Sequence, residues 1–136
     1  MYDNKIAIVI KDDLLTWQKL NVTAFLASSV AIKLPETHGQ ELISASGTVY
    51  LPFIKQPVMV YKADTYEQLK RAFNRAKDRE LQIGVYTHNH FATKTEQENI
   101  AEIARHTDDN LDLVGIIVYG LNKKVDKALD GLKFHL

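Results

Sequence analysis

The chain begins with a run of apolar residues that shows no alternation with polar ones. Residues 6–10 are Ile, Ala, Ile, Val and Ile, and the polar pair Asp12 and Asp13 follows. A strand with one face in water alternates apolar and polar positions, so an unbroken apolar run predicts a strand buried on both faces. We therefore expect residues 6–10 to form a central strand of a sheet that is covered by helices on both sides.

A largely apolar helix is expected directly after this strand, over residues 15–33. At about 100° per residue, small side chains gather on one face, which predicts that this face closely approaches the sheet. That face consists of Thr16, Leu20, Thr23, Ala24, Ala27 and Ala31. The opposite side carries Val22, Phe25 and Ile32, so it needs a second cover, either from the same chain or from the partner chain of a homodimer.

The rest of the chain alternates predicted strands and helices. Strands are expected at residues 58–62, 81–86 and 113–119, and a short edge strand at residues 41–45. Helices are expected after Asp64, where Glu67 has the spacing of a capping box, and over residues 95–106 and 122–129. Because each crossover is long, the pattern predicts an α/β fold with a mixed, mostly parallel sheet between two layers of helices.

Length and composition narrow the class of protein. A chain of 136 residues with 46% hydrophobic residues is expected to fold as one domain over residues 1–136. It contains no cysteine, which excludes a disulfide scaffold, a thiolate zinc site and a cysteine nucleophile. Seventeen acidic residues balance seventeen basic ones, so net charge does not favour a nucleic-acid partner. Without a signal peptide or a membrane-spanning run, we expect a cytoplasmic protein.

Several segments resemble known families. Residues 8–14 with Lys19, residues 56–62 and residues 125–133 resemble the first strand, the second strand and the C-terminal helix of type II peptidyl-tRNA hydrolases. Residues 17–26 and 91–93 more closely resemble a bacterial family catalogued as a domain of unknown function, number two thousand, in the same fold superfamily. The resemblance covers almost the whole chain. It implies a sheet with the main strands in the order second, first, fourth, third, and with the fourth strand antiparallel to the rest.

The same resemblance implies a degenerate catalytic site. Of the paired lysines before the hydrolases' first helix, the second matches Lys19 and the first falls at Trp17. The glutamine and histidine of that helix fall at Thr23 and Leu26, and Thr87 replaces an aspartate at the end of the third strand. A threonine hydroxyl does not replace a carboxylate as a base, so we expect no cleavage of peptidyl-tRNA.

The first and third strand ends carry the remaining candidate chemistry. If the implied strand order holds, Lys19 and the Asp12–Asp13 pair meet His88 and its neighbours at one edge of the sheet. For catalysis the candidates are Lys19, which would neutralise an oxyanion, Asp13, and His88 as a general base. The candidate ligand-binding residues are Asp12, Thr16, Trp17, Thr23, Thr87 and His90.

Each candidate also has a plainer interpretation. His88 and His90, two apart on an extended segment, would ligate one metal ion together with an aspartate, but such pairs are more often polar loops, so we expect no metal and no cofactor. Asp12 and Asp13 would cap the free amides of the helix that follows them. Lys19, in the first turns of that helix, would extend its ammonium group to water, and Trp17, the single tryptophan, would pack in a core or an interface. The sequence contains no glycine-rich nucleotide-binding motif.

Two functions from different classes therefore remain. The first is a binding module that keeps a pocket for a small molecule or nucleotide and has lost the catalytic residues. The alternative is a hydrolase of an acylated small molecule, or of aminoacylated or peptidyl RNA, that uses Lys19, Asp13 and His88. The substituted aspartate favours the binding module.

Overall fold

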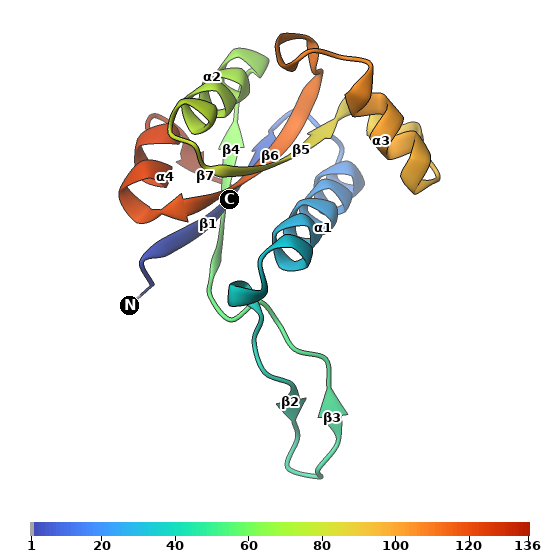
Figure 1. Ribbon diagram of the computed structural model, residues 1–136, viewed down its shortest axis with the longest axis vertical. Coiled ribbons are helices and arrows are strands. Elements are labelled where there is room, and N and C mark those ends of the chain that lie inside the picture. Colours follow the sequence, from blue (N-terminus) through green and yellow to red (C-terminus); the bar gives the residue numbers. More distant parts are fainter. Residues whose placement is uncertain (1) are drawn as a thin grey trace.

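The computed structural model describes residues 2–136 and contains, within them, a five-stranded mixed sheet in the order β5-β6-β1-β4-β7 (Figure 1). The strands are β1 (Asn4–Lys11), β4 (Val58–Ala63), β5 (Gln82–Thr87), β6 (Leu113–Leu121) and β7 (Lys133–Phe134). The order of the four main strands is the one predicted. β1 is central and buried, as its unbroken apolar run indicates.

The strand directions agree only in part with a mostly parallel sheet. β1 pairs in parallel with β4, whereas β6 runs antiparallel to both of its neighbours, β1 and β5, as predicted. β7 was not predicted, and it adds an antiparallel pairing at the edge of β4. β1, β4 and β5 share one direction, but within residues 2–136 the β1–β4 pairing is the one parallel contact of the main sheet.

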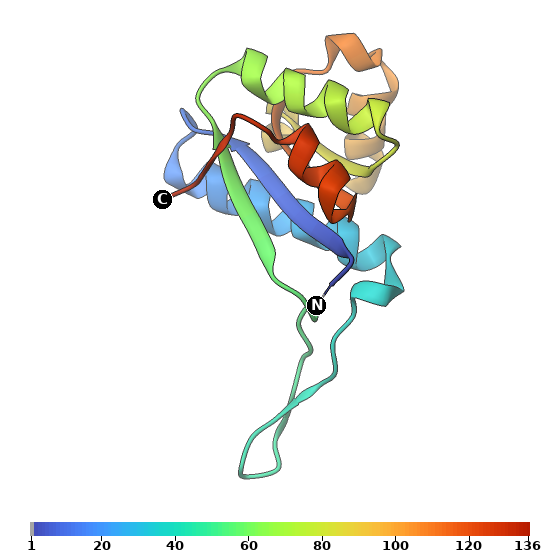
Figure 2. The same ribbon diagram turned by 90° about the vertical axis from the view of Figure 1, so that its left-hand side faces the viewer.

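Helices cover both faces of the sheet (Figures 1 and 2). α1 (Thr16–Lys33) packs on the face that carries the isoleucines of β1, while α2 (Tyr66–Asp78) and α4 (Asn122–Ala128) pack on the other face. α3 (Glu96–Ala104) lies beyond the β5 edge (Figure 1). Three short 3-10 helices connect these elements: η1 (Pro35–Thr37), η2 (His88–Ala92) and η3 (Asp108–Asn110).

The predicted packing face of α1 is wrong. Val22, Leu26 and Val30 face the sheet, whereas the side that carries Ala24 is exposed. Two glycines of the sheet allow α1 to approach it closely. A Cβ on Gly115 would lie 2.7 Å from a Val22 methyl group, and a Cβ on Gly84 would lie 2.6 Å from the Ser29 hydroxyl. α1 thus carries apolar side chains on both sides, although within the described residues no helix is long and apolar enough to cross a membrane.

The capping box expected at Asp64 and Glu67 is displaced by one residue. Thr65 is the N-cap of α2, and its hydroxyl accepts a hydrogen bond from the Gln68 amide at 3.1 Å. The Gln68 side chain in turn accepts from the Asp64 amide at 2.8 Å. Asp64 and Thr65 are both good capping residues, so the sequence leaves the position ambiguous by one residue.

Residues 40–53, which we call the arm, leave the body of the molecule between η1 and β4 (Figure 2). β2 (Leu42–Ile43) and β3 (Val49–Tyr50) pair with each other in a separate two-stranded hairpin. The edge strand predicted at residues 41–45 therefore does not join the main sheet. The base of the arm is fixed by the Gly39 amide, which donates to the Phe53 carbonyl at 2.8 Å.

Candidate functional site

Polar side chains lie at the edge of the sheet where β1, β4 and β5 end, as the sequence predicts, but they form two groups. One group surrounds Lys19 near the ends of β1 and β4. The other surrounds His90 after β5. They are separated because β6 lies between β1 and β5 in the sheet.

Lys19 lies in the first group, between an aspartate and a histidine. Its Nζ donates to Asp12 Oδ1 at 2.9 Å and to His135 Nε2 at 3.1 Å. His135 follows β7, where its backbone amide donates to the Val60 carbonyl at 2.9 Å. Its Nδ1 donates to the Leu136 carbonyl at 2.8 Å, which leaves Nε2 as the acceptor for Lys19. The sequence gives no signal for His135, because its position depends on the unpredicted strand β7.

The charges of this group hold Asp12 in its ionised form. The hydrogen bond from Lys19 lowers the pKa of Asp12 below its ordinary value, and the charges of Lys19 and Lys62 act in the same direction. Lys62 lies 3.7 Å from Asp12 and is shared with Asp64 at 3.2 Å. The candidate Asp13 lies instead on the exposed side, 3.7 Å from Lys11. The group therefore joins α1 to the ends of β1 and β4 through ion pairs and to the end of β7 through a hydrogen bond.

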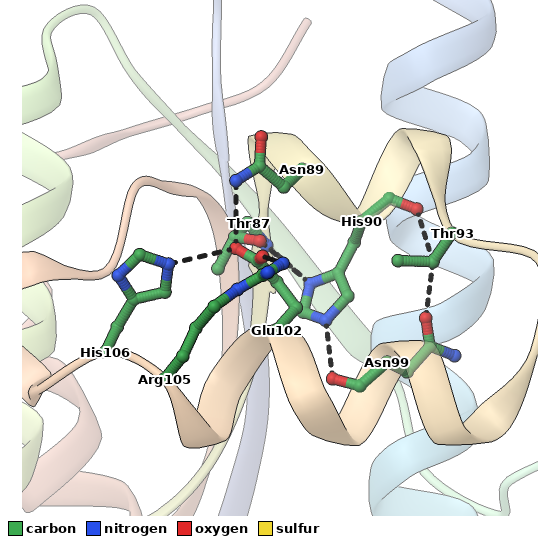
Figure 3. Close-up of polar contacts among 8 residues, drawn as sticks. All are labelled: Thr87, Asn89, His90, Thr93, Asn99, Glu102, Arg105 and His106. Atoms are coloured by element: carbon green, nitrogen blue, oxygen red, sulfur yellow. Dashed lines mark hydrogen bonds and ion pairs between the residues drawn. The ribbon is translucent and has the colours of Figure 1, made fainter.

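His90 belongs to the second group, and both of its ring nitrogens are engaged (Figure 3). The Thr87 amide donates to His90 Nδ1 at 3.0 Å, so the ring proton is on Nε2, which donates to the Asn99 carbonyl at 3.2 Å. Thr87 itself is fully buried. Both ring nitrogens of His90 are thus occupied by hydrogen bonds within the protein, which leaves neither free to bind a metal ion.

The expectation that His88 and His90 lie on an extended segment is wrong, because both lie in the 3-10 helix η2. His88 is exposed, and its ring meets the edge of Phe91 at a centroid distance of 6.0 Å. Within residues 2–136, no cluster of three or more histidine, aspartate or glutamate side chains is arranged to hold a metal ion.

A buried carboxylate, Glu102, joins η2 to α3 (Figure 3). Glu102 is 1% exposed and accepts hydrogen bonds from Asn89 Nδ2 at 3.0 Å and from the Arg105 guanidinium at 2.5 Å, while His106 lies 3.3 Å away. The hydrogen bond from Arg105 lowers the pKa of Glu102, so its charge persists in spite of burial. The sequence pattern does not single out Glu102, which stands among other charged residues of a short helix.

The largest concave surface at this edge is a groove of about 650 Å³ between α1 and the segment formed by β5, η2 and α3. We call it the α1–η2 groove. Aromatic rings form its floor: Tyr86 lies 5.9 Å from Phe25 and 5.1 Å from Phe91, measured between ring centroids. Burial raises the pKa of Tyr86, whose hydroxyl accepts from Asn21 Nδ2 at 3.1 Å. Trp17 meets the edge of Phe91 at 5.7 Å and extends the aromatic surface beyond the groove.

The remaining candidate residues lie apart from this groove. Thr16 is exposed at the start of α1, and the Thr23 hydroxyl donates to the Lys19 carbonyl within the helix at 2.8 Å. In the part of the chain that the structure describes, no hydrogen bond or ion pair joins Lys19 to Thr87, His88 or His90. The structure thus places Lys19 with Asp12 and His90 with Thr87, and does not bring Lys19, Asp13 and His88 together.

Comparison with known proteins places this arrangement in a family. The profile of a family described as a protein of unknown function, DUF2000, matches residues 4–136. The chain belongs to the DUF2000 family. It is also similar to the solved structure of a protein of unknown function, Atu0240 from Agrobacterium tumefaciens strain C58, with 35% sequence identity, full coverage of both chains and a TM-score of 0.95. No curated protein matches the chain.

Proposed function

We propose that this DUF2000 chain is a binding module for a small, neutral, planar heteroaromatic molecule of the nucleoside type, held in the α1–η2 groove. One observation carries the proposal. The groove combines a floor of aromatic rings with polar groups on its rim, and its histidine, His90, is fully occupied by protein hydrogen bonds. The groove thus offers surfaces for binding, and its histidine is not a free base.

The size and lining of the groove suit such a ligand. Its volume of about 650 Å³ lies within the range of about 300–1,000 Å³ that is typical of small-molecule sites. Phe25 is 53% exposed and Tyr86 lies beneath it, so a planar ring stacks on a face that already exists. A stacked aromatic ring contributes roughly 1–3 kcal/mol to the binding of a base.

The charges around the groove favour a neutral ligand. Its rim carries one lysine, Lys94, and one glutamate, Glu96, so it lacks the excess of cations that binds a phosphate. The hydroxyls of Ser28 and Ser29 donate to carbonyls within α1 at 2.6 Å and keep lone pairs that accept hydrogen bonds from a ligand. A nucleoside supplies the donors for these acceptors.

The resemblance to type II peptidyl-tRNA hydrolases supports a ligand at this edge of the sheet, because ligands of α/β folds bind outside the carboxyl ends of the strands. We also propose that the chain shares the fold superfamily of these hydrolases, on the strand order β4-β1-β6-β5. The lack of cysteine supports a role in a reducing compartment such as the cytoplasm.

A hydrolase of acylated substrates is the second candidate, and the group of Asp12, Lys19 and His135 is the observation in its favour. In that role His135 would accept a proton from water and Lys19 would neutralise the oxyanion. It ranks second because Lys19 already donates to both neighbours, so the proton acceptor on His135 is occupied.

The binding proposal is tested by titrating the protein with adenosine in ligand-observed NMR and calorimetry. The Phe25→Ala variant is expected to weaken binding by about fivefold or more, since it removes a stacking face. Phe134→Ala is the matched control, because Phe134 is 52% exposed and stacks on Tyr61 away from the groove. Equal affinity in wild type and Phe25→Ala, or the lack of adenosine binding at millimolar concentration, contradicts the proposal.

A further inference from the structure

The arm has no hydrophobic core of its own. Its strands pair only over Leu42 with Tyr50 and Ile43 with Val49, and the hairpin closes at Gly47, which has a φ of 84°. Every residue from 40 to 53 is exposed. A two-stranded hairpin alone is marginally stable in water at best. The arm therefore needs another surface to cover it.

The arm carries apolar side chains and almost no charge. Its large exposed apolar residues are Leu42, Ile43, Val49, Tyr50, Leu51 and Phe53. Glu41 is the single charged residue between positions 40 and 53. Strands that stay exposed are normally protected by charged residues, especially lysine. The surface that covers the arm is therefore expected to be apolar and uncharged as well.

The outward face of α1 is such a surface. A surface helix normally carries charged residues on the side that faces water. The exposed residues of α1 are Thr16, Trp17, Leu20, Ala24, Phe25, Ser28 and Ile32, none of which is charged, followed by Lys33 at the last position of the helix. Ile32 is 81% exposed and Leu20 is 67% exposed. The small residues Ala24, Ser28 and Ala31 leave a shallow strip between the larger side chains.

The arm and this face also match in length. α1 has 18 residues, which gives about 27 Å at about 1.5 Å per residue. Each leg of the arm has about seven residues, which gives about 23 Å at about 3.3 Å per residue. The arm of one chain points away from its own α1 and body (Figures 1 and 2), so it does not cover the helix from which it continues.

We propose that the arm is a dimerisation element. It packs on the outward face of α1 in a second copy of this chain, and the arm of that copy packs on α1 of the first. The exchange is self-complementary, as a two-fold symmetric dimer requires. The apolar side chains of one arm and one α1 face together supply an area on the order of the 800 Å² per partner found in stable interfaces. Phe25, Ser28 and Ile32 belong both to this face and to the lining of the α1–η2 groove, so an arm packed there covers one side of that groove.

Sedimentation velocity at micromolar protein concentration tests the dimer. We expect the wild type to sediment as a dimer, and both Leu51→Glu on the arm and Ile32→Glu on α1 to sediment as folded monomers. Leu121→Glu is the control, since Leu121 is 53% exposed at the end of β6 and lies outside both surfaces. Circular dichroism checks that each variant is folded. A monomeric wild type, or a dimer that persists in Leu51→Glu, overturns the proposal.

Cross-linking tests which surfaces meet, and the lack of natural cysteine makes it specific. The Leu20→Cys and Leu51→Cys variants are mixed and oxidised with diamide, which takes up the two thiol hydrogens as the disulfide forms. We expect a mixed Leu20–Leu51 disulfide dimer, and none in the control mixture of Leu121→Cys with Leu51→Cys. Exclusive cross-linking of Leu20→Cys to itself would instead show that α1 packs on α1. Adenosine binding is also measured for the Leu51→Glu monomer. This measurement distinguishes failure of the dimer proposal from failure of the ligand-site proposal.

Discussion

The buried carboxylate of Glu102 fixes one wall of the α1–η2 groove. Its hydrogen bond from Asn89 holds η2 against α3, and Arg105 and His106 supply the compensating positive charge. A buried carboxylate without such partners would be neutral or would unfold the helix around it. The wall of the groove therefore depends on Glu102 remaining ionised.

Acid is expected to weaken the fold through Glu102. Because the pKa of Glu102 is lower in the folded protein than in the unfolded chain, its contribution to the free energy of unfolding is present above the unfolded value of about 4.3 and is lost as pH falls through the folded value. Urea unfolding from neutral pH to about pH 3 is expected to show a shallower pH dependence for Glu102→Gln than for wild type. Asp12 and Asp108, whose pKa values are also lowered, remain in both proteins, so identical slopes would contradict this assignment.

At the scale of elements, the sequence pattern predicts the four main strands and the helices, and the family resemblance implies the order of those strands, but neither gives the orientation of α1. Both sides of α1 are apolar, so periodicity alone does not distinguish the side that faces the sheet. The deciding feature is Gly115 on β6, which makes room for Val22, and this contact joins residues far apart in the sequence. β7 was missed for a similar reason, since a two-residue strand has no recognisable pattern.

A double-mutant cycle on Gly115 and Val22 tests the orientation of α1. Gly115→Ala is expected to destabilise the protein by about 1–3 kcal/mol, because its new Cβ would lie 2.7 Å from a Val22 methyl group. Val22→Ala removes that methyl group, so the double variant is expected to lose less than the sum of the two single losses, measured by urea unfolding. Strict additivity would mean that Val22 does not face Gly115.

At the scale of the whole molecule, the sequence predicts the edge of the sheet that carries the polar residues but not how they group. The predicted set of Lys19, Asp13 and His88 is divided because β6 separates β1 from β5 and because Lys19 pairs with Asp12. His135 reaches Lys19 only through β7, and Glu102 is buried only through the tertiary contact with Asn89. Contacts between residues that lie far apart in the sequence leave no local pattern by which they could be predicted.

The purified protein is expected to show little or no hydrolysis of peptidyl-tRNA. Thr87 replaces the aspartate implied by the resemblance and is fully buried, and loss of such a transition-state partner costs roughly a thousandfold in rate. In a gel assay of peptidyl-tRNA, wild type and Lys19→Ala are expected to match the reaction without protein. Robust cleavage that Lys19→Ala or His88→Ala abolishes would establish the hydrolase alternative.

The most direct test of the binding proposal is an amide-resolved NMR titration of the isotope-labelled protein with adenosine. We expect saturable shifts confined to the residues that line the α1–η2 groove, including Asn21, Phe25, Tyr86 and Phe91, together with the indole signal of Trp17. The amides of Asp12 and His135 are expected to stay unchanged, because they lie on the other side of β6 from β5. Saturable shifts centred on Lys19 and His135, or no shifts at millimolar adenosine, would contradict the account.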